Sequence, residues 1–194
     1  MNYLAHAWLS FNRPEILVGN MISDFVKGKK RFDFDEAIQK GIMLHRDIDT
    51  FTDAHESTKR AKQFLKPSAG LYAGAFIDIV YDHFLAKDVN EFNDERLLEF
   101  SISVYETLNL HINILPVKFA AMLQYMVRDN WLYNYKNLHG IQQSFYGLAR
   151  RAKYLENSGG IFESFQNNYE ALREYYNSFF PEVKAFAYKQ LEIM

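Results

Sequence analysis

The chain has 194 residues, no cysteine and a formal net charge of −2, and 48% of its residues are hydrophobic. This apolar content excludes intrinsic disorder and allows one sizeable core. The small negative charge excludes the broad basic surface of a general nucleic-acid binder. Without cysteine, disulfide and thiolate chemistry are excluded, so any metal ion must be held by histidine and carboxylate side chains.

The N-terminus has neither the basic region nor the long apolar run of a signal peptide. No stretch approaches the roughly eighteen unbroken apolar residues of a membrane-spanning helix. We therefore expect a cytoplasmic protein without a membrane span.

Apolar residues recur with a helical period along most of the chain, and no segment alternates as a strand would. Pro14 and Pro116 suit the first turn of a helix, whereas Pro67, Ser158 to Gly160 and Pro181 mark expected breaks. The expected helical segments are 15–27, 33–53, 56–66, 71–86, 94–111, 116 to about 135, 138–154, 161–178 and 182–193. The pattern predicts a single all-α domain over residues 1–194, a bundle of about eight helices.

The stretch 41–55 carries the densest set of chemically active side chains. His45, Asp49 and Asp53 recur every four residues, which stacks them on nearly one face of a helix. Short acids and imidazoles are groups that hold metals and move protons. The structural alternative is a buried histidine oriented by one carboxylate, without a metal. Asp53 and His55 lie near the helix end, where capping or solvent exposure would explain them equally well.

Residues 71–86 are apolar nearly all round, which predicts a buried helix. Asp78, Asp82 and His83 lie in this segment. A buried carboxylate needs a partner, because burying its charge unpaired is strongly unfavourable. A metal ion is one such partner, and the structural alternative for Asp78 is an ion pair with Arg46 or Arg150.

Together these segments supply a set of nitrogen and oxygen ligands without sulfur, which suits Mn²⁺, Mg²⁺, Fe²⁺ or Zn²⁺. The candidates are Asp24, His45, Asp49, Asp78, Asp82 and His83, and His6, which suits either a ligand or a satisfied core histidine. A metal ion in such a site lowers the pKa of bound water and neutralises charge on a phosphoryl oxygen. Arg46 is placed to clamp a phosphate. His111 and His139 lack acidic neighbours and suit structural or surface positions.

Four motifs, in this order and spacing, resemble those of the acyl carrier protein phosphodiesterase family. They are Asn2-Tyr-Leu-Ala-His6, Gly19-Asn20-Met-Ile-Ser-Asp24-Phe-Val-Lys-Gly28, Gly41-Ile-Met-Leu-His45-Arg46-Asp-Ile-Asp49-Thr-Phe-Thr-Asp53 and Asp78-Ile-Val-Tyr-Asp82-His83-Phe-Leu. Similarity continues at Asn130-Trp131-Leu and from Ile141 to Arg151, so that it spans nearly the whole chain.

The resemblance implies an all-helical fold that is a divergent relative of the HD metal-dependent phosphohydrolases, although here the adjacent pair reads Asp82-His83 and not His-Asp. It implies hydrolysis of the phosphodiester that joins 4′-phosphopantetheine to a serine of holo-acyl carrier protein, with Mn²⁺ preferred and Mg²⁺ or Fe²⁺ as alternatives. The expected metal ligands are Asp24, His45, Asp82, His83 and His6, and the expected catalytic residues are Arg46, Asp49 and Asp78.

A carrier-protein substrate would be acidic, so its docking requires a local basic patch. Lys27, Lys29, Lys30 and Arg31 follow the Asp24 segment directly, and Arg150 forms a second patch with Arg151 and Lys153. Lys27 stands where the family commonly has arginine. A solvated loop would explain the first patch equally well.

Two other readings of the sequence remain open. An HD-like phosphohydrolase acting on a nucleotide or another small phosphodiester would use the same site without a protein substrate. A non-catalytic helical binding module would use the polar cluster only to hold the fold together, with its acids paired to arginines.

Overall fold

In the computed structural model, the described residues 1–152, 155 and 159–194 form eleven α-helices and no strand, which confirms the predicted all-α class. The helices are α1 (Tyr3–Trp8), α2 (Pro14–Ile22), α3 (Glu36–Ala54), α4 (Glu56–Ala69), α5 (Ala73–Ala86), α6 (Asp94–Leu110), α7 (Val117–Arg128), α8 (Trp131–Asn134), α9 (Leu138–Ala149), α10 (Gly159–Asn167) and α11 (Tyr169–Ile193). Four short 3₁₀ segments join them: η1 (Ser23–Phe25), η2 (Gly28–Asp33), η3 (Gly70–Tyr72) and η4 (Ile112–Ile114). Within the described ranges, no helix is both long and apolar enough to cross a membrane.

The breaks predicted at Pro67 and Pro181 are wrong, because both prolines lie inside helices, in α4 and α11. An interior proline loses one backbone hydrogen bond, but packing of α11 against α3 and α4 stabilises the continuous helix. The chain turns instead at Gly70, whose φ is 55°. The segment expected from residue 116 to about 135 is divided at Asn130, which has a left-handed φ of 42°.

The break predicted around Ser158 falls partly outside the described residues. Ser158 itself is not described, and α10 begins at Gly159, so the two glycines of that motif are helical.

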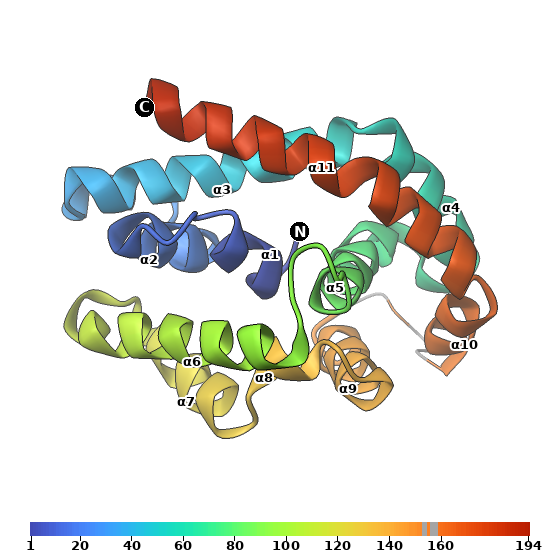
Figure 1. The fold of residues 1–194 in the computed structure, drawn as a ribbon. Coiled ribbons are helices and arrows are strands. Elements are labelled where there is room, and N and C mark those ends of the chain that lie inside the picture. Colours follow the sequence, from blue (N-terminus) through green and yellow to red (C-terminus); the bar gives the residue numbers. More distant parts are fainter. Residues whose placement is uncertain (153–154, 156–158) are drawn as a thin grey trace.

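The long helices α3 and α11 run side by side over the N-terminal helices (Figure 1). Helix α5 lies behind the N-terminus and contacts α1, α4 and α9. Helices α6, α7 and α8 form the lower edge in this view. Buried apolar side chains from nearly all of these helices pack into one continuous core. The first histidine-bearing helix, α1, is therefore held between α2 and α5.

Helices α2 and α3 cross at backbone contact, and two glycines make this approach sterically feasible. A Cβ atom on Gly19 would lie 2.1 Å from the carbonyl oxygen of Ile38, and one on Gly41 would lie 2.3 Å from that of Ile16. No side chain fits at these distances, so the helix pair depends on glycine at both positions. The close crossing brings the end of α2 against the face of α3 that carries His45.

We predict that Gly19→Ala and Gly41→Ala each lower the free energy of unfolding by about 1–3 kcal/mol, because the added methyl forces the helices apart. Gly147 in α9 is the control, since a Cβ there meets nothing within 4 Å. Gly147→Ala should raise the free energy of unfolding by about 0.5–1 kcal/mol. Urea denaturation followed by circular dichroism measures all three, and equal effects would contradict the role of the crossing.

Candidate metal centre

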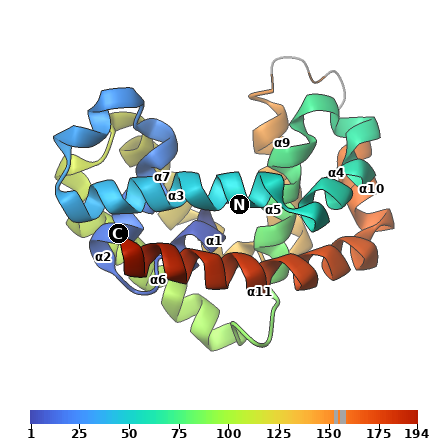
Figure 2. The ribbon, with the colours of Figure 1, turned by 90° about the horizontal axis from the view of Figure 1, so that it is seen from above.

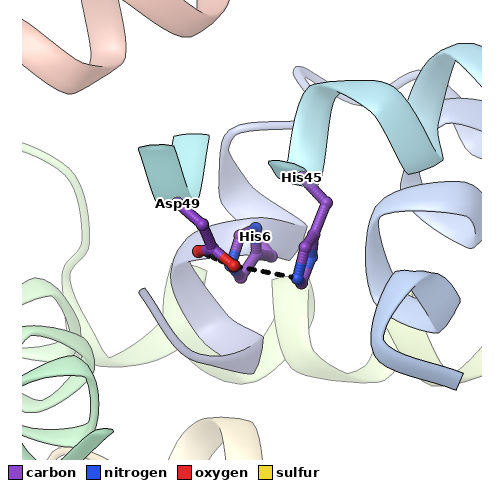
Figure 3. A group of neighbouring side chains, drawn as sticks. All are labelled: His6, His45 and Asp49. Atoms are coloured by element: carbon purple, nitrogen blue, oxygen red, sulfur yellow. Dashed lines mark ion pairs between the residues drawn. The ribbon is translucent and has the colours of Figure 1, made fainter. Parts of the chain in front are cut away.

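Three potential metal ligands meet where α1 crosses α3: His6 from α1, and His45 and Asp49 from α3 (Figure 3). Their ligand atoms all lie within 4.8 Å of one another. The two imidazole rings stack at 3.8 Å between centroids, and each Nε2 lies 3.2 Å from an oxygen of Asp49. Asp24, from η1, approaches the Nε2 of His45 to 3.4 Å. The structure thus brings together His6, His45, Asp49 and Asp24.

Asn20 fixes the orientation of both histidines. Its side-chain NH₂ donates to the carbonyl oxygen of His6 at 2.8 Å and to the hydroxyl of Ser10 at 3.1 Å, so its Oδ1 must act as an acceptor. The Nδ1–H of His6 donates to this Oδ1 at 2.8 Å. The Nδ1–H of His45 donates to the backbone carbonyl of Asn20, also at 2.8 Å. Both rings therefore direct Nε2 toward the carboxylates.

The two Nε2 atoms are buried and neither makes a hydrogen bond of good geometry. With Nδ1 protonated, a neutral imidazole presents a lone pair at Nε2. Two such lone pairs facing carboxylate oxygens repel one another unless a proton or a metal cation lies between them. A metal-binding histidine typically donates a hydrogen bond from the ring nitrogen that does not bind the metal, as Nδ1 does here. The donor set therefore fits a divalent cation.

The charges of the cluster show which group carries a proton when no metal is bound. Burial disfavours the charged form of His45, but attraction to the nearby carboxylates of Asp24 and Asp49 outweighs it and raises its pKa to about 9. Burial and the adjacent charge of His45 lower the pKa of His6 to about 4. Burial likewise disfavours the charged form of Asp49, but attraction to the two nearby histidines keeps its pKa well below the ordinary value. When no metal is bound, the proton on His45 thus supplies the positive charge that faces the carboxylates.

Asp78 from α5 lies at the edge of the cluster. Its Oδ1 is 3.0 Å from the amino group of Met1, which is also 3.4 Å from Asp49. Burial raises the pKa of Asp78, although the amino group opposes this shift. Asp78 is thus adjacent to the cluster without belonging to the group whose ligand atoms converge.

Asp82 and His83, which we expected to be metal ligands, are placed elsewhere by the structure. The carboxylate of Asp82 accepts backbone N–H bonds from Asn2, Leu4 and Ala5, so it caps the first turn of α1. Burial raises the pKa of Asp82 to about 7, and these N–H bonds oppose that shift. The geometry gives Asp82 a structural partner in place of a metal.

His83 is fully buried, and both ring nitrogens are occupied. Its Nδ1 donates to the carbonyl oxygen of Tyr135 at 2.6 Å, and its Nε2 accepts from the hydroxyl of Tyr169 at 2.8 Å. Adjacent helical residues point about 100° apart, which directs His83 toward α8 and α11 while Asp82 faces α1.

Arg46, expected to clamp a phosphate, points toward η1, where its Nη2 donates to the carbonyl oxygen of Val26 at 3.1 Å. Asp53 pairs with Lys62 on the surface, and the His55 side chain caps α4. Of the expected partner-binding residues, Lys27, Lys29 and Lys30 are exposed and Arg31 is partly buried on η2. Arg150 is exposed at the end of α9 and Lys153 lies outside the described residues.

A cavity of about 960 Å³ opens beside the cluster. Asp24, Asp49 and Asp78 line it, and so do α8, α9 and the residues beside them. The other lining residues are Met1, Asn2, Tyr3, Phe25, Ala75, Ile79 and Asp129. The α8–α9 side comprises Trp131, Asn134, Tyr135, Asn137, His139, Gly140, Gln143, Ser144, Tyr146, Gly147, Leu148, Arg150 and Arg151. This volume suits a small-molecule or cofactor-sized ligand.

Sequence reasoning did not find the roles of Asn20 and of the α9 wall. Asn20 lies inside one of the motifs, but the sequence does not indicate which histidine rings an asparagine in an apolar helix will contact. His139 was expected at a structural or surface position; it is exposed, which confirms a surface position, and it also lines the cavity.

The sequence model of the family described as acyl carrier protein phosphodiesterase matches residues 1–183. The chain belongs to this family. Similar relatives named acyl carrier protein phosphodiesterase come from Yersinia enterocolitica (28% identity over 96% of this chain and 97% of the relative) and Serratia proteamaculans (29%, over 94% and 95%). One from Klebsiella pneumoniae is 29% identical over 96% of this chain and 97% of its own. No solved structure matches the chain.

We predict that Asp82→Ala lowers the free energy of unfolding by about 3 kcal/mol or more, because it leaves the buried N–H groups of α1 without acceptors. Asp53→Ala, which removes an exposed ion pair, is the control and should cost about 0–1 kcal/mol. Chemical denaturation of the metal-free protein makes the comparison. An Asp82→Ala protein of unchanged stability that no longer binds metal would instead restore Asp82 as a ligand.

Proposed function

We propose that this protein is a metal-dependent phosphodiesterase that removes 4′-phosphopantetheine from holo-acyl carrier protein. The observation that carries the proposal is the pair of oriented, buried histidine Nε2 atoms that face carboxylates beside a ligand-sized cavity. Membership of the acyl carrier protein phosphodiesterase family supplies the reaction and the substrate.

His6, His45 and Asp49 would hold the metal, with Asp24 as a further ligand. Their mixture of imidazole and carboxylate donors suits Mn²⁺, and also Mg²⁺ or Fe²⁺. When bound, such an ion lowers the pKa of water and neutralises a phosphoryl oxygen. Its binding would displace the proton that His45 otherwise carries.

Asp78 would take part in proton transfer. Its carboxylate lines the cavity, and burial raises its pKa although the amino group of Met1 opposes this shift. A raised carboxyl pKa favours a role in proton transfer. Overall, water adds across the phosphodiester, so that the carrier-protein serine regains its hydroxyl and phosphopantetheine leaves with a terminal phosphate.

The basic residues lie beside the cavity. Lys27, Lys29, Lys30 and Arg31 follow Phe25, which lines the cavity, and Arg150 and Arg151 line it from α9 and the residues just after it. Figure 2 shows the segment after α2 on the left and helix α9 on the right. An acidic carrier protein docked over the cavity would meet positive charge from both segments.

The direct test incubates holo-acyl carrier protein with the Mn²⁺-loaded protein. Intact-protein mass spectrometry should show loss of the phosphopantetheine mass, and chelation should stop it. Asp49→Asn should lower kcat/KM at least about a hundredfold, because it weakens metal binding and water activation. Hydrolysis of compounds in a nucleotide panel, with no change in the carrier protein, would contradict the proposed substrate.

We predict that Asn20→Leu weakens Mn²⁺ binding about 10–100-fold and lowers kcat/KM, because His6 loses the side-chain acceptor that orients it. Thr52→Val is the control: Thr52 is also buried and donates only to the carbonyl of its own helix at Ile48, according to the described contacts. Isothermal titration calorimetry and kinetics measure the effects. Wild-type metal affinity in a folded Asn20→Leu protein would refute the orienting role.

Replacing Lys29, Lys30 and Arg31 by Glu should raise KM for holo-acyl carrier protein about tenfold and flatten its dependence on salt. A triple variant with the same charge change at Lys59, Lys66 and Lys189, which are exposed on α4 and α11, is the control. Steady-state kinetics at two ionic strengths compares them. An unchanged KM in the first variant would remove η2 from the docking surface.

A further inference from the structure

One face of α9 forms a wall of the cavity. Gly140, Gln143, Ser144 and Gly147 are spaced three or four residues apart, so they share one side of the helix, and all of them line the cavity. Their neighbours Ile141 and Phe145 point the other way, into the core. Helix α9 also lines the cavity with His139, Tyr146 and Leu148, so small residues stand among larger ones on this wall and leave room for a ligand.

This wall belongs to the same cavity as the metal centre. Asp24 and Asp49, whose carboxylate oxygens lie 3.4 and 3.2 Å from the buried Nε2 of His45, line the cavity together with α9. A substrate whose phosphorus atom lies at this centre must extend along the rest of the cavity, and α8 and α9 contribute much of its described lining. The volume of about 960 Å³ is much larger than a phosphate group requires.

The chemistry of the α8–α9 side matches a flexible chain that contains amides. Asn134, Asn137 and Gln143 offer side-chain amides, which can both donate and accept hydrogen bonds. Trp131 and Leu148 offer apolar surface. A pantetheine chain has two amide groups, a hydroxyl and a dimethyl branch separated by methylenes, so the arm and this wall both combine hydrogen-bonding groups with apolar groups.

We propose that the α8–α9 side of the cavity is the subsite for the pantetheine arm of the substrate, with Gly147 providing space and Gln143 a hydrogen-bonding amide. This inference rests on the proposed function and assigns one half of the cavity to the leaving arm. The carrier protein itself then stays outside, at the opening flanked by the basic residues.

The two glycines of the wall have different reasons to be glycine. A Cβ on Gly140 would lie 2.1 Å from the carbonyl oxygen of Asn134, so Gly140 is required for α9 to approach α8. Among the described residues, a Cβ on Gly147 would meet nothing within 4 Å. Gly147 lies in the last turn of α9, and no described contact there requires the lack of a side chain. Open space at this position is what an arm lying along α9 requires.

The test uses two substrates of the Mn²⁺-loaded protein: holo-acyl carrier protein and bis(p-nitrophenyl) phosphate, a phosphodiester without the arm. The quantity measured is the ratio of their kcat/KM values. Gly147→Leu should lower this ratio by at least about tenfold, because the leucine side chain fills the space of the arm. Gln143→Leu should lower it about threefold to tenfold, because one hydrogen bond to the arm is lost.

Gln142→Leu is the matched control, since Gln142 is exposed on the same helix and is not among the residues that line the cavity. Its ratio should equal that of the wild type. Gln143→Leu changes an exposed residue, so it tests the subsite even if Gly147→Leu does not fold.

Two outcomes overturn the inference, and they differ. The first outcome is a wild-type ratio in folded Gly147→Leu and Gln143→Leu, with the wild-type enzyme active on both substrates. It would show that the arm does not bind along α9, and the proposed function would stand. A wild-type protein that hydrolyses neither substrate would overturn the proposed function, and the subsite with it.

Discussion

The hydrogen bonds of Asn20 to two histidines are the interaction on which the candidate site depends. Through its side chain and its own backbone carbonyl, one residue holds the Nδ1–H groups of His6 and His45, which come from different helices. An imidazole has only two nitrogen atoms, so fixing one determines where the other points. These hydrogen bonds set the direction of both rings, and the two Nε2 atoms converge on Asp49 as a result.

The fold supplies the positions that this interaction requires. Gly19 and Gly41 let α2 and α3 touch, which places Asn20 within reach of His45. Asp82 anchors the first turn of α1 through three backbone N–H groups, and α1 carries His6. Asp82, which the sequence suggested as a metal ligand, thus positions the helix that carries His6.

The cavity links this centre to the outer face of the molecule. Carboxylates lie at one part of its wall and amide and aromatic side chains at another, while basic residues stand near its opening. A substrate made of a protein, a phosphodiester and a flexible arm would meet these three environments in turn. The carboxylates of the candidate metal centre and the basic residues Arg150 and Arg151 line the same cavity from different elements of the fold.

The sequence by itself determined the helical class, the family and most of the chemically active residues, because apolar periodicity and the four motifs are local properties of the chain. It identified His6, His45, Asp49 and Asp24 as candidates, and those are the residues that meet. Only the tertiary structure decided that Asp82 and His83 have other partners, that helices pass through Pro67 and Pro181, and that Asn20 and α9 matter. The physical reason is that spacing along one helix fixes which side chains share a face. Which partner each face meets is set by packing between helices, where glycine contacts and buried hydrogen bonds act over long sequence separations.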